Sequence, residues 1–212
     1  MPISSSLSGL YAITDSELIP EIRFISTVES ALLGGARVIQ YRDKSSDTKK
    51  RLQQAQLLQH LCQQYDVPLI INDDWELAAQ VKAAGVHLGE NDGDIYQARQ
   101  QLGQQAWIGA SCYNDLVLAN KALAAGANYI AFGRFFNSNT KPNARIAETA
   151  LLSQARQKFN CPIVAIGGIT PENGATLLEA GADCLAAIHG VFAHDEVKAA
   201  AEQYTHLFNE KK

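Results

Sequence analysis

The sequence has no uninterrupted apolar run long enough to cross a bilayer. Residues 1–10 also lack the basic segment and the continuous apolar core of a signal peptide. The four cysteines are scattered without CxxC pairing, which argues against a disulfide framework and against a zinc site. We therefore expect a cytoplasmic protein with no membrane partner, whose cysteines act as small apolar residues.

An excess of positive charge is missing as well. The formal net charge is -4 at pH 7 and the pI is near 5.7, whereas nucleic-acid-binding surfaces normally carry clustered Lys and Arg. No low-complexity stretch divides the chain, and 212 residues with 47% hydrophobic content suffice for one domain with a sizeable core. The composition argues against a nucleic-acid partner and leaves a homo-oligomer open.

Common catalytic motifs are also absent. The chain has no GxSxG, GxGxxG or GxxxxGK[ST] segment, and its histidines and cysteines do not combine into a Ser-His-Asp or Cys-His set. Structural or solvated roles are expected for all five histidines, of which only His189 stands at a predicted strand end near a candidate phosphate site. We therefore predict chemistry that depends on a metal ion, cations and positioning.

The sequence does contain a loose repeat of a glycine turn followed by an apolar run, beginning near residues 33, 84, 125 and 180. Each copy is interpreted as a helix that a left-handed glycine ends, leading into a strand buried on both faces. Further strands are expected at 10–14, 68–72, 106–111 and 162–167. Helices are expected at 22–34, 47–65, 74–84, 94–102, 114–125, 147–159, 171–180 and 195–209.

Helices that alternate with apolar strands indicate a parallel sheet. About eight such units in a chain of this length fit a closed α/β barrel of the (β/α)8 or TIM type, with one domain over residues 1–212. A doubly wound open sheet is the alternative, because periodicity does not show closure.

Polar side chains stand just after several of the predicted strands. In α/β folds the loops at the carboxyl ends of the strands gather around one crevice, so these side chains are expected to meet there. They are Arg42, Lys44, Asn72, Asp73, Asp92, Ser111 and Lys141. Three cations and two carboxylates suit a metal-chelated polyanion better than an apolar ligand.

The second strand leads into Gln40-Tyr41-Arg42-Asp43-Lys44. Alternation along a strand lets Gln40, Arg42 and Lys44 share one direction while Tyr41 turns away. An arginine fork and a lysine charge suit phosphate oxygens, and a solvated loop is the alternative.

Acidic residues end two neighbouring strands. Asp73 and Asp92 are a candidate pair of Mg²⁺ ligands, because hard divalent ions use one or two carboxylates together with substrate phosphates and water. Helix capping is the competing interpretation. We assign the capping role to Asp74 and Asp94 instead.

Two later segments have compositions that favour the binding of an anionic group. The irregular stretch 134–146 contains Ser138-Asn139-Thr140-Lys141, whose short polar groups and lysine suit an anionic group, although a plain flexible loop has the same composition. Gly168 follows the seventh strand, and Ile188 with His189 follows the eighth. Barrels commonly bind phosphate at that place, and a tight turn is the alternative.

These motifs, in this order, resemble the thiamine-phosphate synthase family over nearly the whole chain. The segments that carry the resemblance are Leu10-Tyr11-Ala12-Ile13-Thr14-Asp15, Gln40-Tyr41-Arg42-Asp43-Lys44, Ile71-Asn72-Asp73, Val86-His87-Leu88-Gly89 with Asp92, Gly109-Ala110-Ser111, Thr140-Lys141 and Ala165-Ile166-Gly167-Gly168-Ile169-Thr170. The resemblance implies a barrel transferase that joins hydroxymethylpyrimidine diphosphate to a thiazole phosphate. Loss of diphosphate would leave a pyrimidine methyl cation, which the thiazole nitrogen captures.

The resemblance also implies a role for each matching residue, with Mg²⁺ as cofactor and the two small molecules as partners. Asp73 and Asp92 would bind Mg²⁺, and Arg42, Lys44, Ser111 and Lys141 would be catalytic. The pyrimidine diphosphate would contact Gln40, Tyr41, Arg42, Asp43, Lys44, Asn72, Ser111 and Lys141. The thiazole phosphate would contact Ser138, Asn139, Thr140, Gly168, Ile188 and His189.

His189 stands where the family usually has a serine, which leaves its side-chain role open while backbone amides can serve unchanged. Two rival functions remain at this point. One is a thiazole tautomerase-like isomerase of the same family, which needs no diphosphate or metal site. The other is a non-catalytic sensor of the thiazole phosphate.

Overall fold

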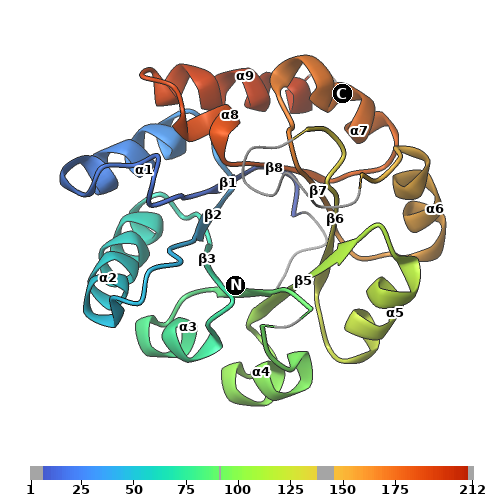
Figure 1. Cartoon of the computed structure of the whole chain (residues 1–212), viewed down its shortest axis with the longest axis horizontal. Helices are drawn as coiled ribbons and strands as arrows, with labels where there is room; N and C mark the ends of the chain where they lie inside the picture. Colours follow the sequence, from blue (N-terminus) through green and yellow to red (C-terminus); the bar gives the residue numbers. More distant parts are fainter. Residues whose placement is uncertain (1–6, 91, 138–145, 210–212) are drawn as a thin grey trace.

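The computed structural model describes residues 7–90, 92–137 and 146–209, and within them eight parallel strands close into a barrel. The strand order follows the sequence, and β8 returns to pair with β1 through Gly9 and Cys184. Figure 1 shows the helices as a layer outside the ring of strands. The predicted (β/α)8 barrel is confirmed, and the open-sheet alternative is wrong.

The strands are β1 (Gly9–Ile13), β2 (Val38–Tyr41), β3 (Leu69–Asn72), β4 (Gly85–Leu88), β5 (Trp107–Tyr113), β6 (Tyr129–Phe132), β7 (Ile163–Ile166) and β8 (Cys184–Ala187). The helices are α1 (Phe24–Leu33), α2 (Thr48–Gln64), α3 (Trp75–Val81), α4 (Ile95–Leu102), α5 (Leu116–Ala124), α6 (Ala150–Lys158), α7 (Pro171–Glu179), α8 (His189–Phe192) and α9 (Val197–Asn209), with a 3-10 turn at Glu21–Arg23. None of them is long and apolar enough to span a membrane, in the residues described.

Two apolar cores follow from the alternation of side chains along the strands. Leu10 and Ala12 point outward into a core between the sheet and the helices. Tyr11 and Ile13 point inward, where they pack with Val164 in a smaller core inside the barrel. Because successive residues of a strand face opposite sides, this register decides which polar groups reach the barrel interior.

Aspartate side chains begin several helices. Asp74 accepts a hydrogen bond from the Leu77 backbone N–H at 2.8 Å, and Asp94 accepts one from Tyr96 at 2.8 Å. Each satisfies a backbone donor that has no partner within its helix. The prediction that Asp74 and Asp94 act as caps is confirmed.

Glycine ends three of the four repeats as predicted, with φ of 93° at Gly35, 108° at Gly126 and 117° at Gly181. The prediction is wrong for the repeat near residue 84, because Gly85 lies in β4 and α3 ends instead at Lys82, which has φ of 54°. A Cβ on Gly85 would lie 1.8 Å from the carbonyl oxygen of Trp107 in β5. Glycine is needed there because the neighbouring strand approaches closely.

Two similar arginine networks close the amino end of the barrel. Arg99 in α4 donates to the carbonyl oxygens of Gly103 and Ala106 at 2.8 Å and to that of Gly126 at 2.9 Å. It also reaches Asn128 Oδ1, which accepts the Ile108 N–H at 2.8 Å.

Arg156 repeats this pattern between α6 and β8. It donates to the Gly181 carbonyl at 3.0 Å and to the Asp183 carboxylate, whose Oδ2 accepts the Ile163 N–H at 2.7 Å. The glycine turns before β6 and β8 are therefore alike: the carbonyl of each accepts a hydrogen bond from an arginine of a helix, Arg99 in α4 or Arg156 in α6.

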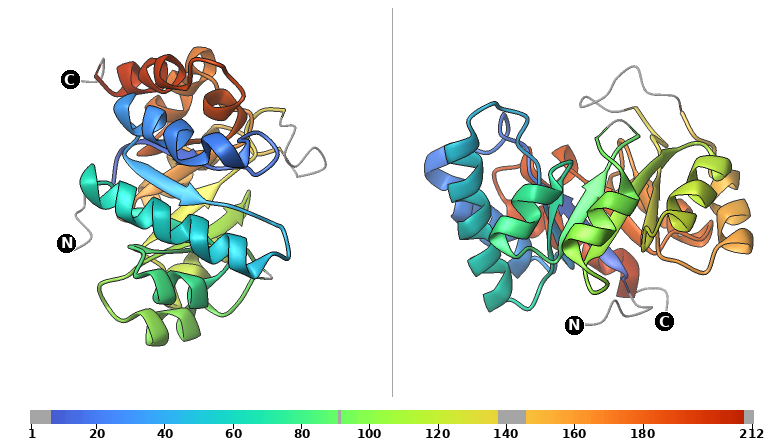
Figure 2. Two further views of the ribbon diagram at one scale, coloured as in Figure 1. Left: turned by 90° about the vertical axis from the view of Figure 1, so that its left-hand side faces the viewer. Right: turned by 90° about the horizontal axis from the view of Figure 1, so that it is seen from below.

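The carboxyl ends of the strands lie at the opposite end. The left view of Figure 2 shows the segments that follow β1 and β2 projecting from this same end of the barrel. Arg42 and Lys44, the candidate site residues that follow β2, therefore lie at this end of the barrel.

Candidate active site

A cavity of about 310 Å³ lies at the carboxyl end of the barrel and reaches into its interior. Seven of the predicted site residues line it, namely Gln40, Arg42, Asn72, Ser111, Gly168, Ile188 and His189. They come from or directly follow β2, β3, β5, β7 and β8. We call this space the barrel cavity.

A second cavity of about 440 Å³ lies beside the first. It is lined by five of the predicted residues, Asp43, Lys44, Asn72, Asp73 and Asp92. Asn72 lines both cavities, so the two spaces share a wall at the end of β3. We call the second space the acidic cavity, and together the two cavities place Arg42, Lys44, the two carboxylates and the Ser111 hydroxyl at one end of the fold.

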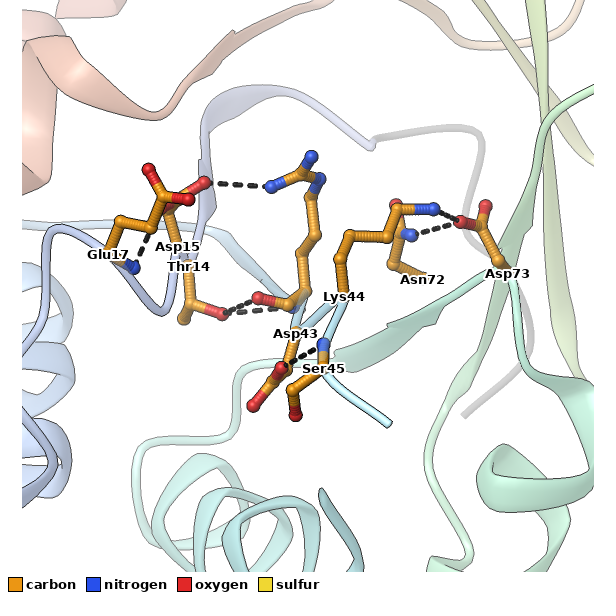
Figure 3. Close-up of polar contacts among 9 residues, drawn as sticks. Thr14, Asp15, Glu17, Asp43, Lys44, Ser45, Asn72 and Asp73 are labelled. Carbon is orange, nitrogen blue, oxygen red and sulfur yellow. Dashed lines mark hydrogen bonds and ion pairs between the residues drawn. The ribbon is translucent and has the colours of Figure 1, made fainter. Parts of the chain in front are cut away.

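The centre of the acidic cavity is the Asp73 carboxylate. Lys44 Nζ and Asn72 Nδ2 both donate to Asp73 Oδ2, the latter at 2.5 Å (Figure 3). Asp73 has φ of 64°, a left-handed conformation that a non-glycine residue rarely adopts. The backbone N–H of Asp73 donates to the His87 carbonyl at 2.8 Å, which fixes the residue against β4.

Asp92 lies next to Asp73. Burial raises the pKa of the Asp92 carboxyl, and the negative charge of Asp73 raises it further. Two carboxylates held this close repel each other unless a cation or a proton lies between them. The pair therefore has the donor chemistry of a site for a hard divalent cation.

Arg42 is held by residues that follow β1. Its guanidinium donates to Asp15 Oδ2 at 2.8 Å, and its backbone N–H donates to Thr14 Oγ1 at 2.9 Å. Asp15 is 9% exposed, so this ion pair is largely screened from water. Sequence reasoning did not single out Asp15 as a functional residue, although it directly follows a predicted strand in the same way as the residues that were chosen.

Three residues inside the barrel cavity were also missed. His87 was predicted to be structural, yet its Nε2 lies 3.0 Å from Ser111 Oγ and its Nδ1 lies 3.2 Å from the Tyr129 hydroxyl. The Tyr129 hydroxyl lies 2.9 Å from that of Tyr11, which accepts from Gln40 Nε2 at 2.8 Å. The signal that points to Tyr11 is its inward position in the alternation of β1.

The loop after β7 has a shape that requires glycine. Gly168 has φ of 65°, and a Cβ there would lie 2.2 Å from the Asn137 carbonyl oxygen. The Phe136 N–H donates to the Gly167 carbonyl at 3.0 Å, so the segment that follows β6 is bound to this loop. A short helix, α8, follows β8 and begins at His189.

Two predicted site residues, Tyr41 and Asp43, form contacts with neighbouring parts of the protein itself. Tyr41 lies between the sheet and α2, where its hydroxyl donates to Gln54 Oε1 at 3.0 Å, and it lines neither cavity. The geometry therefore gives no support to substrate contact by Tyr41. Asp43 accepts from the Ser45 N–H at 2.7 Å and lies 3.0 Å from Lys50 Nζ, so its carboxylate mainly shapes the loop.

The four remaining predicted residues, Ser138, Asn139, Thr140 and Lys141, lie outside the described residues.

A closed barrel of this kind, with charged groups around the carboxyl ends of its strands, is typical of (β/α)8 enzymes. Residues 10–191 match the family model described as thiamine monophosphate synthase. The chain belongs to this family.

Named relatives agree with this assignment. The chain is 58% identical over 194 residues to the thiamine-phosphate synthase of Saccharophagus degradans, covering 91% of this chain and 89% of that protein. It is 53% identical over 206 residues to the thiamine-phosphate synthase of Nitrosococcus oceani, covering 97% and 95%. The solved structure of thiamine phosphate pyrophosphorylase from Pyrococcus furiosus superposes with a TM-score of 0.88 at 33% identity, covering 97% of this chain and 98% of that one.

Proposed function

We propose that the two cavities together catalyse the transfer step of thiamine biosynthesis, in which hydroxymethylpyrimidine diphosphate is joined to a thiazole phosphate and diphosphate is released. The observation that carries this proposal is the Asp73–Asp92 pair beside Lys44 and Asn72, on the shared wall of two cavities. Such a set suits a diphosphate that is chelated in the acidic cavity and extends into the barrel cavity, where the reacting rings would lie. An isomerase or a sensor would not need this acidic pair, and none of the relatives reported above carries such a name.

Mg²⁺ fits the acidic cavity. Asp73 and Asp92 line it together and would be the carboxylate ligands. Mg²⁺ is commonly held by one or two carboxylates, with substrate phosphates and water completing its shell. When bound, the ion would supply positive charge that stabilises the departing diphosphate.

The cations of the two cavities would bind and orient the diphosphate. Lys44 has a side chain 56% exposed, so its ammonium can move from Asp73 to a phosphate oxygen. Arg42 is held by Asp15 through one guanidinium nitrogen and lines the barrel cavity, where its other N–H groups would face the ligand. Ser111 adds a hydroxyl donor from β5, and Lys141 is proposed as a further diphosphate contact on the basis of the family resemblance.

The opposite side of the barrel cavity would bind the thiazole phosphate. Gly168, Ile188, His189 and Gly190 line it there, at the loop after β7 and the start of α8. Glycine in this loop lets backbone amides approach an anion. Ser138, Asn139 and Thr140 are proposed to complete this contact.

Apolar side chains complete the barrel cavity. Ile13, Val164 and Ile166 line it between the two phosphate-binding sides. A pyrimidine methyl cation would react rapidly with water, so an apolar lining protects it until the thiazole nitrogen reaches it. In this mechanism no protein nucleophile is required, and the side chains act by holding charge and excluding water.

The test is a product assay with both substrates and Mg²⁺, measuring diphosphate and thiamine phosphate. The proposed transferase forms both products in equal amounts. Isomerisation of a thiazole phosphate without diphosphate release would support the isomerase instead, and binding without turnover would support the sensor. We also propose that the protein is cytoplasmic and that residues 1–212 form one domain.

A further inference from the structure

A chain of hydrogen-bonding groups crosses the barrel cavity from one predicted substrate-binding residue to another. In order, its members are Gln40, Tyr11, Tyr129, His87 and Ser111, and we call it the relay. Successive contacts measure 2.8, 2.9, 3.2 and 3.0 Å. The members come from β2, β1, β6, β4 and β5, so only the closed barrel brings them together.

The direction of donation follows from the Gln40 end. The amide Nε2 of Gln40 carries hydrogens and offers no acceptor, so it donates to the Tyr11 oxygen. The Tyr11 hydrogen then needs an acceptor, and among the described residues the Tyr129 oxygen is the one in contact. Both tyrosines are only 1% exposed, and an unpaired hydroxyl at such a depth is costly. Tyr11 therefore donates to Tyr129.

The same reasoning continues to Ser111. Tyr129 accepts from Tyr11, so its own hydrogen is directed to His87 Nδ1, which is then the unprotonated nitrogen of the ring. The hydrogen of a neutral His87 lies on Nε2 and is donated to Ser111 Oγ. Burial raises the pKa of Tyr11 and that of Tyr129, so both hydroxyls keep their protons at neutral pH.

We propose that the relay makes Ser111 a hydrogen-bond donor toward the ligand in the barrel cavity. Ser111 accepts from His87, so its own hydrogen is directed away from the ring. With the opposite direction, Ser111 would donate to His87 and present lone pairs to the ligand, which would repel an anionic oxygen. Tyr11, Tyr129 and His87 are therefore positioning residues that act through Ser111.

This inference deepens the proposed function and rests on it, because that function places an acceptor such as a diphosphate oxygen beside Ser111. The charge on the leaving diphosphate grows during the reaction. A donor fixed in advance stabilises that charge without having to reorient during the reaction. Loss of the relay should consequently lower kcat more than it raises KM.

The direction of the relay can be read without substrates. Nitrogen-15 NMR of the full chain at pH 7 should show the His87 ring with hydrogen on Nε2 and a bare Nδ1, and the signal is identified by its loss in His87→Gln. Tyr129→Phe removes the donor to Nδ1 and should shift the ring toward a mixture of tautomers. A ring with its hydrogen on Nδ1, or on both nitrogens, would overturn the proposal. Because no substrate is present, this result is independent of the proposed reaction.

Kinetics then test whether the relay acts through Ser111. We expect Tyr129→Phe to lower kcat about tenfold, with KM for the diphosphate substrate changed less than about threefold. Tyr65→Phe is the matched control, since it loses a tyrosine hydroxyl bond to Glu29 of 2.8 Å outside the barrel and should stay within twofold.

A double variant gives the decisive comparison. Ser111→Ala with Tyr129→Phe should be no more than about twofold worse than Ser111→Ala alone, because the relay would have nothing left to position. If the fold-decreases in kcat of the two single variants multiply in the double variant, Tyr129 acts independently of Ser111, and the proposal is contradicted. Tyr11→Phe should show the same non-additivity, and it replaces Tyr129→Phe if the latter does not fold.

Discussion

At the amino end of the barrel Arg99 spreads its guanidinium over the carbonyls of Gly103, Ala106 and Gly126, whereas at the carboxyl end Arg42 donates to the carboxylate of Asp15. Arg99 is 9% exposed and lines neither of the two cavities described. Arg42 lines the barrel cavity. An arginine thus binds backbone carbonyls at the amino end, whereas an arginine at the carboxyl end lines the cavity proposed to bind a ligand. This agrees with the division of (β/α)8 barrels into an end that serves stability and an end that carries the active site.

Aspartate shows the same division. At the amino end Asp183 satisfies the Ile163 N–H and the Arg156 guanidinium together. At the carboxyl end Asp73 and Asp92 are held side by side, where their charges repel. The comparison indicates that the proposed cation site lowers the stability of the fold, because its two carboxylates repel each other.

The largest effect is expected from the acidic pair. Asp73→Ala or Asp92→Ala should lower kcat/KM about a thousandfold, which corresponds to roughly 4 kcal/mol of transition-state stabilisation. The measurement is diphosphate release at saturating Mg²⁺. Asp115→Ala is the matched control, because Asp115 caps α5 and its loss should cost about 1 kcal/mol of stability while activity is kept. Full activity in the Asp73→Ala, Asp92→Ala double variant would rule out the metal assignment.

A change of the opposite kind is expected at the amino end. Arg99→Leu should reduce the free energy of unfolding by about 3 kcal/mol, because the carbonyls of Gly103, Ala106 and Gly126 all lose the charged donor that joins them. Urea unfolding measures this loss, and KM for both substrates should be unchanged at a temperature where the variant is folded. A variant with normal stability and a raised KM would contradict the comparison of the two ends.

Asp15→Asn should have a smaller effect on activity. The amide keeps the size of the side chain but loses the charge that holds Arg42, so we expect kcat/KM to fall about tenfold. The matched change at the other end is Asp183→Asn, which should alter stability and leave kcat/KM within twofold. Equal activity losses in the two variants would show that Asp15 has no special role in holding Arg42.

The smallest predicted effect is a gain in stability. Asp92→Asn removes the repulsion with Asp73 and should raise the Tm by about one degree in metal-free buffer at pH 7, as weak surface charge pairs do. The sign follows from linkage: folding raises the pKa of Asp92, so the destabilisation exists above that pKa and is lost as the pH falls through it. The gain should therefore disappear in acid, and a gain that is the same at every pH would contradict this cause.

The sequence was sufficient to predict the barrel and many of the described residues around its opening. Strand ends could be located from apolar runs and turns, and parallel strands bring their carboxyl ends together, which is why Asp73 and Asp92 could be paired. Gly85 was misassigned because local sequence does not reveal how closely β5 approaches. The Arg42–Asp15 pair and the contact of Tyr11 with Tyr129 depend on strand register around the closed barrel, which hydrophobic periodicity does not contain.

The central claim is that acidic and basic groups at the carboxyl end bind one chelated diphosphate. Calorimetric titration with inorganic diphosphate, with and without Mg²⁺, tests it most directly. The account predicts that Mg²⁺ tightens binding to the wild-type protein at least tenfold, and that this gain is lost in the Asp73→Ala, Asp92→Ala double variant. Equal affinity with and without Mg²⁺, or a full Mg²⁺ effect in the double variant, would contradict it.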